Sequence, residues 1–302
     1  MKTSPPLISV ITPTFNRASF LGQAVESILG QSHSRLELLV VDDGSTDGTR
    51  ALMQRYLGDE RVRYFHQENQ GQSAARRFAL GQARGEFIAF LDSDNIAAPT
   101  RLATCLGALQ QSRKYDVAYG DVIKIDGDGN EISRSNIRRY SGRILPQMLQ
   151  ENCVSMNTAL ARRCVFDSDV MTVPHRRVAD DYEMWLRISA RHRFLYLAEY
   201  LAYYRVMREQ ISSDKIGRFD ANEAILNDFL REYRGLITSA ELRAGWSGFM
   251  LRKGEYHASQ GRIVAALQCY MRALRHTPGS RRPWRFIARL AAFGLIRSRN
   301  AG

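Results

Sequence analysis

Residues 36–49, LELLVVDDGSTDGT, decide the fold class of this 302-residue chain. The run Leu36–Val41, apolar except for Glu37, predicts a strand, and two acids follow it directly. A Gly-Ser turn comes next, and polar residues able to cap a helix precede the helix predicted over Asp47–Leu57. A strand, an acidic loop and a helix in succession are typical of an α/β unit.

The same alternation of strand and helix patterns continues on both sides of this unit, up to about residue 115. It predicts a mostly parallel sheet flanked by helices, with any ligand site at the carboxyl ends of the strands. Further strands are predicted over Leu7–Thr12, Val62–Phe65 and Phe87–Leu91, and further helices over Ser19–Gln31 and Ser73–Ala83.

The pattern changes from Asp116 onward. A hairpin is predicted, with a first strand over Asp116–Ile125 and a second strand that begins at Glu131. A helix is predicted over Asp180–Arg191, and short strands over Phe194–Leu197 and Ala202–Val206. After about Ile216 only helical patterns remain. We therefore expect an α/β domain over residues 1–215, with halves of about 1–115 and 116–215, and an all-helical extension over 216–302.

The segment Asp92-Ser93-Asp94 follows the strand predicted over Phe87–Leu91. Residues i and i+2 of an extended chain point to the same side, so the two carboxylates can share a site. Mg²⁺ and Mn²⁺ are commonly held by one or two carboxylates together with substrate phosphates. The alternative is a polar turn in which Asp94 or Asn95 caps a helix that begins near Pro99.

Asp43 follows the strand Leu36–Val41, as Asp92 and Asp94 follow the strand Phe87–Leu91. Its carboxylate can accept hydrogen bonds from a uracil N–H or from ribose hydroxyls, which recognises a nucleotide without positive charge. The alternative is that the acidic loop only forms a turn and caps the helix behind it.

Four segments in order resemble the successive signatures of glycosyltransferase family 2, which comprises inverting enzymes with the GT-A fold. They are ISVITPTFNRASFLGQAVESILGQS at 8–32, LLVVDDGSTDGT at 38–49, ENQGQSAARR at 68–77 and GEFIAFLDSDN at 85–95. The resemblance is close from Leu7 to Arg113 and looser to about Ser213. It implies a nucleotide-sugar site in the first half of the domain and an acceptor site in the second.

The resemblance also implies roles for individual residues. Asp43 would contact the base, and Asp92 and Asp94 would serve the ribose and a divalent metal, Mn²⁺ or Mg²⁺, with Asp94 preferred as the metal ligand. The other residues assigned to the donor site are Pro13, Thr14, Asn16, Arg76 and Ser93.

The segment VADDYEMWLR at 178–187 resembles the Glu-Asp-x-x-x-Trp segment of the family, which begins a helix near the acceptor. Direct inversion needs a general base within reach of the acceptor hydroxyl. Asp181 is the expected base and Asp180 the alternative; both acids can instead simply favour the helix N-terminus. Trp185 either stacks on an acceptor sugar or packs in the core.

Three positions depart from the family pattern. Arg77 stands where Asn is usual, Asn95 where a third Asp is common, and Met207 where many relatives have a His near the diphosphate or metal. The segment containing Gln210, Ser212 and Ser213 is expected to close over the donor.

The C-terminal extension carries most of the net charge of +12. Residues 231–302 contain 14 Lys/Arg and 3 Asp/Glu, which is +11. A basic amphipathic helix over Arg281–Arg299 suits an anionic membrane surface, although a solvated face is the alternative. Nucleic acid is not expected, because no nucleic-acid motif accompanies the charge. Six residues fall at the offsets of one tetratricopeptide repeat: Gly254, Gly261, Ala266, Tyr270, Ala273 and Pro278. A generic helical hairpin is the alternative.

Cysteine spacing and hydropathy indicate where in the cell the protein is expected. The four cysteines have neither disulfide-framework nor zinc-ligand spacing, and there is no secretory signal pattern and no apolar stretch long enough to span a membrane. We expect a cytoplasmic protein, or one peripheral on the inner face of a membrane. The sequence predicts no oligomeric state.

These features together predict inverting transfer of a sugar from a nucleotide-diphosphate donor, a UDP-sugar, to a hydroxyl of a glycan or lipid-linked acceptor. A nucleotidyltransferase of similar fold is one alternative, but Thr14-Phe15-Asn16-Arg17 replaces the Gly-rich loop that holds a triphosphate. A non-catalytic scaffold that binds partners through the helical extension is another. A dehydrogenase is not expected, because no G-x-G-x-x-G follows the first strand.

Overall fold

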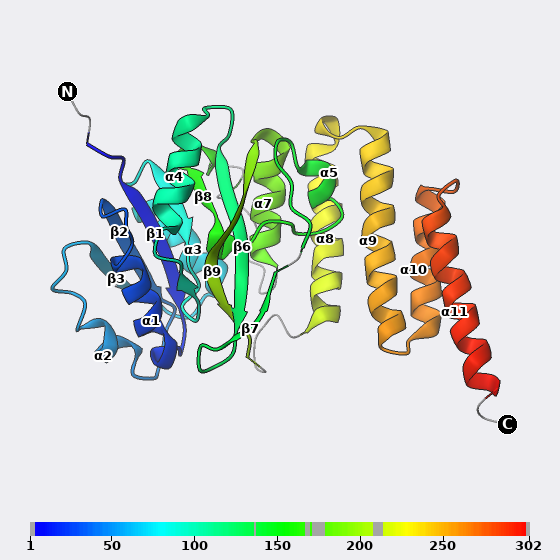
Figure 1. The fold of residues 1–302 in the computed structure, drawn as a ribbon, viewed down its shortest axis with the longest axis horizontal. Helices are drawn as coiled ribbons and strands as arrows, with labels where there is room; N and C mark the ends of the chain where they lie inside the picture. The colour runs from blue at the N-terminus through cyan, green and yellow to red at the C-terminus, as the bar shows by residue number, and fades with distance from the viewer. Residues whose placement is uncertain (1–3, 136, 167–169, 171–178, 208–213, 300–302) are drawn as a thin grey trace. The chain divides into compact units, whose positions relative to one another are not determined.

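A computed structural model describes residues 4–135, 137–166, 170, 179–207 and 214–299 of the chain (Figure 1). It divides into two compact units. The first comprises residues 1–144 and 153–222, and the second comprises residues 145–152 and 223–302.

The first unit is built on one mixed sheet. Among the described residues its nine strands have the order β3-β2-β1-β4-β8-β6-β9-β5, and β7 pairs with β6. The strands β3, β2, β1 and β4 are parallel to one another, whereas β8 is antiparallel to both of its neighbours. The strands are β1 Ile8–Thr14, β2 Leu36–Asp42, β3 Val62–His66, β4 Phe87–Phe90, β5 Ile96–Ala97, β6 Val117–Ile125, β7 Glu131–Arg134, β8 Leu160–Arg162 and β9 Phe194–Arg205.

The fold class predicted from the sequence, an α/β sheet of the GT-A type with a helical C-terminal region, is confirmed. Three details differ. The short strands β5 and β8 were not predicted, and the two strands expected around residues 194–206 form the single strand β9. The helix expected over Asp47–Leu57 is only α2, Thr49–Met53, and its first residue donates to the Asp47 side chain from both its backbone N–H and its hydroxyl.

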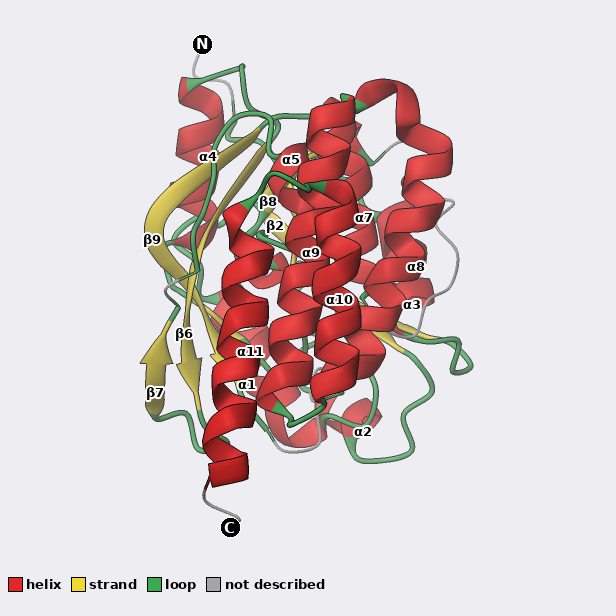
Figure 2. Cartoon of the chain, turned by 90° about the vertical axis from the view of Figure 1, so that its right-hand side faces the viewer, coloured by secondary structure: helices red, strands yellow, loops and turns green. Residues whose placement is uncertain are grey.

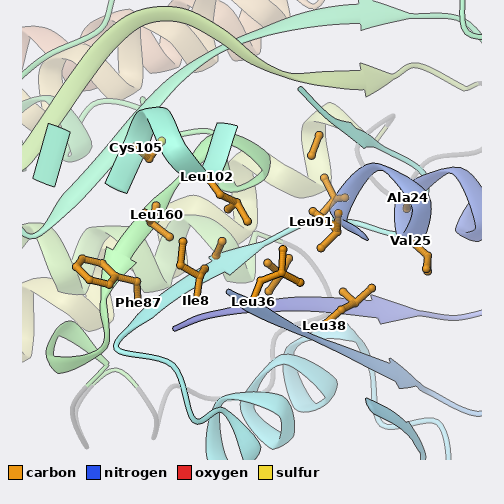
Figure 3. Close-up of a cluster of buried hydrophobic side chains, with 14 of the residues drawn as sticks. Ile8, Ala24, Val25, Leu36, Leu38, Phe87, Leu91, Leu102, Cys105 and Leu160 are labelled. Carbon is orange, nitrogen blue, oxygen red and sulfur yellow. The ribbon is translucent and has the colours of Figure 1, made fainter. Parts of the chain in front are cut away.

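Alternate residues of each strand face opposite sides of the sheet. On one side Ile8, Leu36 and Leu38 pack with apolar residues of α1 (Ala18–Leu29) and α4 (Arg101–Gln111) to form a buried core (Figure 3). On the other side lie α3 (Gln72–Gln82) and α7 (Asp180–Arg191), as the contact of Phe90 with Trp185 shows for α7. This arrangement brings α3 and α7 to the same side of the sheet.

The second unit is helical. It contains α5 (Leu145–Met148), the end of α8 (Lys215–Tyr233), α9 (Ser239–Ser259), α10 (Ile263–His276) and α11 (Arg281–Arg299), of which the last three lie side by side (Figure 2). A capping box begins α9, because Thr238 accepts from the Glu241 N–H and the Glu241 carboxylate accepts from the Thr238 N–H. Within the described part of the chain, every helix is too short or too polar to cross a bilayer.

The hairpin of α9 and α10 depends on a close contact at Gly254. A Cβ at this position would lie 2.4 Å from Cε1 of Tyr270. We expect Gly254→Ala to lower the free energy of unfolding of this unit by about 1–3 kcal/mol through overpacking, despite the better helix propensity of Ala. In Gly107→Ala of α4, where nothing lies within 4 Å of the new Cβ, Ala should instead stabilise. Thermal melts of both variants check this; equal stabilisation would contradict the contact.

Candidate active site

Polar residues gather where the parallel strands β1, β2 and β4 end. Thr14 ends β1 opposite Asp42 of β2, and the Asp43 N–H donates to the Thr14 carbonyl over 2.9 Å. Pro13 and Thr14 are both buried, and Thr14 Oγ1 has no hydrogen-bond partner among the described residues. The carboxyl ends of the strands therefore meet at one edge, as expected for a sheet of this kind.

Asn16 joins the loops that follow β1 and β2. Its φ of 50° is left-handed, a conformation that Asn tolerates better than most residues. Its Oδ1 accepts from the Thr46 N–H at 2.8 Å, and its own N–H donates to Ser45 Oγ at 2.9 Å. Asn16 therefore holds these two loops in a fixed relation at the strand ends.

Asp43 is 3% exposed, and its carboxylate accepts three hydrogen bonds from the segment before α3. The donors are Gln67 Nε2 at 2.7 Å, the Gln70 N–H at 2.9 Å and the Gly71 N–H at 2.8 Å. Because a carboxylate has about four lone-pair sites, one further donor, such as a base N–H, can still be accepted.

Asp92, just beyond β4, is bound from three sides. Its carboxylate accepts from Arg76 Nη2 at 2.6 Å, Gln72 Nε2 at 3.0 Å and Asn157 Nδ2 at 3.0 Å. Its backbone N–H in turn donates to Asn157 Oδ1 at 2.8 Å. The orientation of the Asp92 carboxylate is therefore set by side chains of α3 and of the loop before β8.

Asp92 and Asn157 lie close to the point where the pairing of β4 with β8 ends. The fully buried Arg101 lies at this point, and its Nη2 donates to the carbonyls of Phe90 and Ala159 at 2.8 and 3.0 Å. Burial lowers the pKa of Arg101 to about 10, which leaves it charged at neutral pH. Its guanidinium therefore bridges the end of β4 and the residue before β8.

Arg76 of α3 connects this segment with α7. Its Nη2 donates to Asp92, and its Nη1 donates to Asp180 Oδ2 over 2.5 Å. The guanidinium is almost completely buried. Burial opposes its charge, but the carboxylates of Asp180 and Asp92 outweigh that effect and raise the pKa of Arg76. One cation thus joins an acid at the end of β4 to an acid in the first turn of α7.

Asp181, next to Asp180 in the first turn of α7, has a different environment. Burial and then the negative charge of Asp180 raise the pKa of Asp181 above its ordinary value, against the opposing charges of Arg76 and Arg218. A carboxylate with a raised pKa is a stronger base, so the two neighbouring acids are suited to different tasks.

Asp94 is partly exposed at the end of the acidic segment, where Arg205 of β9 fixes the backbone. Arg205 Nε donates to the Asp94 carbonyl at 3.0 Å, and the Arg205 N–H donates to Asn95 Oδ1 at 2.8 Å. Ser93, just before Asp94, is buried. Among the described residues no cluster of three or more metal-binding side chains occurs. Mg²⁺ is commonly held by one or two carboxylates together with substrate phosphates, and Asp94 is compatible with such a site.

Trp185, one turn after Asp181, is fully buried. Its ring packs edge-on against Phe90 and Phe194, with centroid distances of 6.4 and 6.1 Å. This geometry corresponds to the core-packing alternative, because the ring has no face open to a sugar. The segment with Gln210, Ser212 and Ser213 lies outside the described residues.

Comparisons with known proteins show the family to which this chain belongs. A model of the family described as Glycosyl transferase family 2 matches residues 9–170, which is more than half of the chain. The chain belongs to glycosyltransferase family 2. One relative is the putative teichuronic acid biosynthesis glycosyltransferase TuaG of Bacillus subtilis, 32% identical over 70% of this chain and 83% of TuaG. The match to the uncharacterized glycosyltransferases of three Rickettsia species covers 61% of this chain but only 26–30% of those relatives.

Two solved structures share the fold of this family 2 chain. Residues 1–349 of Staphylococcus aureus TarS in complex with UDP-GlcNAc have a TM-score of 0.60 and 18% identity, over 90% of this chain and 92% of the other. The mannosyltransferase PcManGT of Pyrobaculum calidifontis, in complex with GDP-Man and Mn²⁺, has a TM-score of 0.63 and 20% identity, over 97% and 81%.

Three residues that contact the acidic segment have no signal in the local sequence patterns. Gln72 and Asn157 hold Asp92, and Arg205 holds the backbone of Asp94. Gln72 lies inside the segment 68–77, which resembles a family signature, and Arg205 lies two residues before Met207. Neither position by itself indicates a role. Asn157 lies in a single 3₁₀ turn, Met156–Thr158, in the connection between α5 and β8, so only the folded chain reveals its role.

A separate shallow hollow of about 460 Å³ lies at the amino ends of β1 and β4. Pro6, Glu86, Phe87 and Arg162 are among its lining residues. This hollow therefore lies at the edge of the sheet opposite to Asp43 and Asp92.

Proposed function

We propose that this chain transfers a sugar, with inversion, from a nucleotide-diphosphate donor to a hydroxyl of a glycan or lipid-linked acceptor. The observation that carries the proposal is the Arg76 bridge, which joins Asp92 on the donor side to Asp180, the neighbour of the base candidate Asp181. Membership of glycosyltransferase family 2 supports the reaction class. The similarity to TuaG, a putative teichuronic acid biosynthesis enzyme, supports an acceptor in polysaccharide biosynthesis of the cell envelope.

In this proposal Pro13, Thr14, Asn16 and Asp43 form the nucleotide pocket. The spare acceptor capacity of Asp43 supports contact with a base N–H, which suits uracil. The UDP-GlcNAc bound to TarS also supports a UDP-sugar, whereas PcManGT is in complex with GDP-Man. Asp92 and Ser93 would meet the ribose, although three protein donors already hold the Asp92 carboxylate.

Asp94 is the proposed ligand of Mn²⁺ or Mg²⁺. Because Asp92 is bound by Arg76, we do not give it a metal-binding role beside Asp94. A divalent cation at this position supplies positive charge that stabilises the departing diphosphate. The Mn²⁺ in the PcManGT complex supports the assignment.

Asp181 is the proposed general base, which takes the proton of the acceptor hydroxyl as that oxygen attacks the anomeric carbon. Its raised pKa suits this task, whereas Asp180 forms an ion pair with Arg76 and acts as a positioning residue. We propose residues 1–215 as the catalytic domain, with donor and acceptor halves of about 1–115 and 116–215, and 216–302 as its extension. The free cysteines support a cytoplasmic location.

The test is a thermal-shift screen of nucleotide sugars with and without Mn²⁺. A donor at a hundred times its Kd stabilises the folded state by about 2.7 kcal/mol, which raises Tm by about 5 °C. We expect this shift to need Mn²⁺ and to disappear in Asp94→Ala. It should persist in Asp128→Ala, which removes an exposed acid from the β6–β7 hairpin. If no nucleotide sugar shifts Tm under either condition, the proposal is wrong.

A further inference from the structure

A stripe of apolar side chains on α10 faces solvent. It consists of Ile263, Val264, Leu267 and Met271, which are 44%, 73%, 41% and 47% exposed. Val264, Leu267 and Met271 follow one another at spacings of three and four residues, and Ile263 lies four residues before Leu267, which places all four on one side of the helix. The opposite face of α10 is already used, since Tyr270 packs against Gly254 of α9.

The first half of α11 adds an exposed aromatic ring and a row of cations. Phe286 stacks on Tyr270 at 5.4 Å, so this side of α11 packs on α10. Trp284 remains 56% exposed, and the exposed charged residues around it are Arg281, Arg282, Arg285 and Arg289. Part of the apolar side of this half of the helix therefore packs within the protein, while Trp284 stays exposed.

The charge of this region has one sign. Residues 256–302 contain nine arginines and no aspartate or glutamate. Arg272 is bound to Glu223 of α8, while Arg262 and Arg275 are exposed at the two ends of the α10 stripe. A second copy of this chain would bring the same positive charge to the contact, and like charges repel.

We propose that the outer face of α10, together with Trp284 and the arginines of α11, binds the surface of an anionic lipid bilayer. Aliphatic side chains enter the boundary between head groups and acyl chains, Trp lies at head-group level, and each arginine near the surface adds about 1 kcal/mol. A nucleic acid would satisfy the arginines but would leave the aliphatic stripe in water. This contact is independent of sugar transfer and would hold the catalytic domain near a lipid-linked acceptor.

Binding of the full chain to vesicles tests the proposal. We expect cosedimentation with phosphatidylcholine vesicles that contain about 30% phosphatidylglycerol, weaker binding at high salt, and at least about tenfold weaker binding to pure phosphatidylcholine. The triple variant Val264→Ser/Leu267→Ser/Met271→Ser and the double variant Arg281→Gln/Arg285→Gln should each lose binding at least about tenfold. Ile132→Ser on β7, which removes an equally exposed apolar residue, should bind as the wild type does.

Two results would overturn the proposal. One is equal binding to neutral and anionic vesicles, or binding that the triple variant retains in full. The other is self-association in light scattering that the triple variant abolishes, which would assign the stripe to a second copy. The substituted side chains are exposed, so the variants should melt as the wild type does, and a nucleotide sugar should still stabilise them. Loss of vesicle binding with donor binding retained separates this surface from the active site.

Discussion

Asp181→Asn is expected to lower kcat by about 10²- to 10⁴-fold, the usual contribution of a general base. Asn keeps the size of the side chain but cannot take the proton of the acceptor hydroxyl. Donor binding should be nearly unchanged, because the donor contacts are assigned to the ends of β1, β2 and β4. Steady-state kinetics with saturating donor measure the effect, and full turnover in Asp181→Asn would contradict the assignment.

The neighbouring acid provides a matched control with a different signature. The negative charge of Asp180 is one of the causes that raise the pKa of Asp181. Asp180→Asn removes that charge, so the pKa of Asp181 should fall. Since the base must be deprotonated, the acidic limb of kcat/KM should move to lower pH in Asp180→Asn. A limb that moves to higher pH would show that Asp180 does not act on the base in this way.

Arg76→Met is expected to cost about 3–5 kcal/mol of unfolding free energy, as breaking a buried ion pair from one side commonly does. The change leaves the carboxylates of Asp92 and Asp180, which are 23% and 16% exposed, without their shared cation. Urea denaturation at neutral pH measures the loss as a lower midpoint.

Two further variants show whether charge causes this loss. Arg55→Met, an exposed arginine, should change stability by less than about 0.5 kcal/mol. Adding Asp180→Asn to Arg76→Met should restore part of the stability, because one uncompensated carboxylate disappears. If Arg76→Met costs no more than Arg55→Met, the bridge does not hold α3, β4 and α7 together.

Local patterns in the sequence were sufficient for the elements that carry the site. The predicted helix Asp180–Arg191 has the observed bounds of α7, and the strands that precede Asp43 and Asp92 were predicted to within a residue. These elements are long enough for their periodicity to be visible. The strand β8 has three residues and β5 has two, which is too short for any period to appear.

The contacts among the site residues could not be predicted in the same way. Arg76 and Asp180 are 104 residues apart, and Asp92 and Asn157 are 65 apart. No local pattern links such positions, because the pairing depends on how α3, α7 and the loop before β8 pack around β4. The environment of Trp185 could not be predicted either. Only its packing against Phe90 and Phe194 distinguishes a core residue from one that stacks on a sugar.

Calorimetric titration of Asp181→Asn with a UDP-sugar in the presence of Mn²⁺ tests the central claim most directly. This measurement distinguishes donor binding at the ends of β1, β2 and β4 from the catalytic role of the base on α7. We predict that this variant binds the donor with a Kd within about threefold of the wild-type value, a difference below about 1 kcal/mol, while sugar transfer is lost. Absence of donor binding to both wild type and variant, with or without Mn²⁺, would contradict the account.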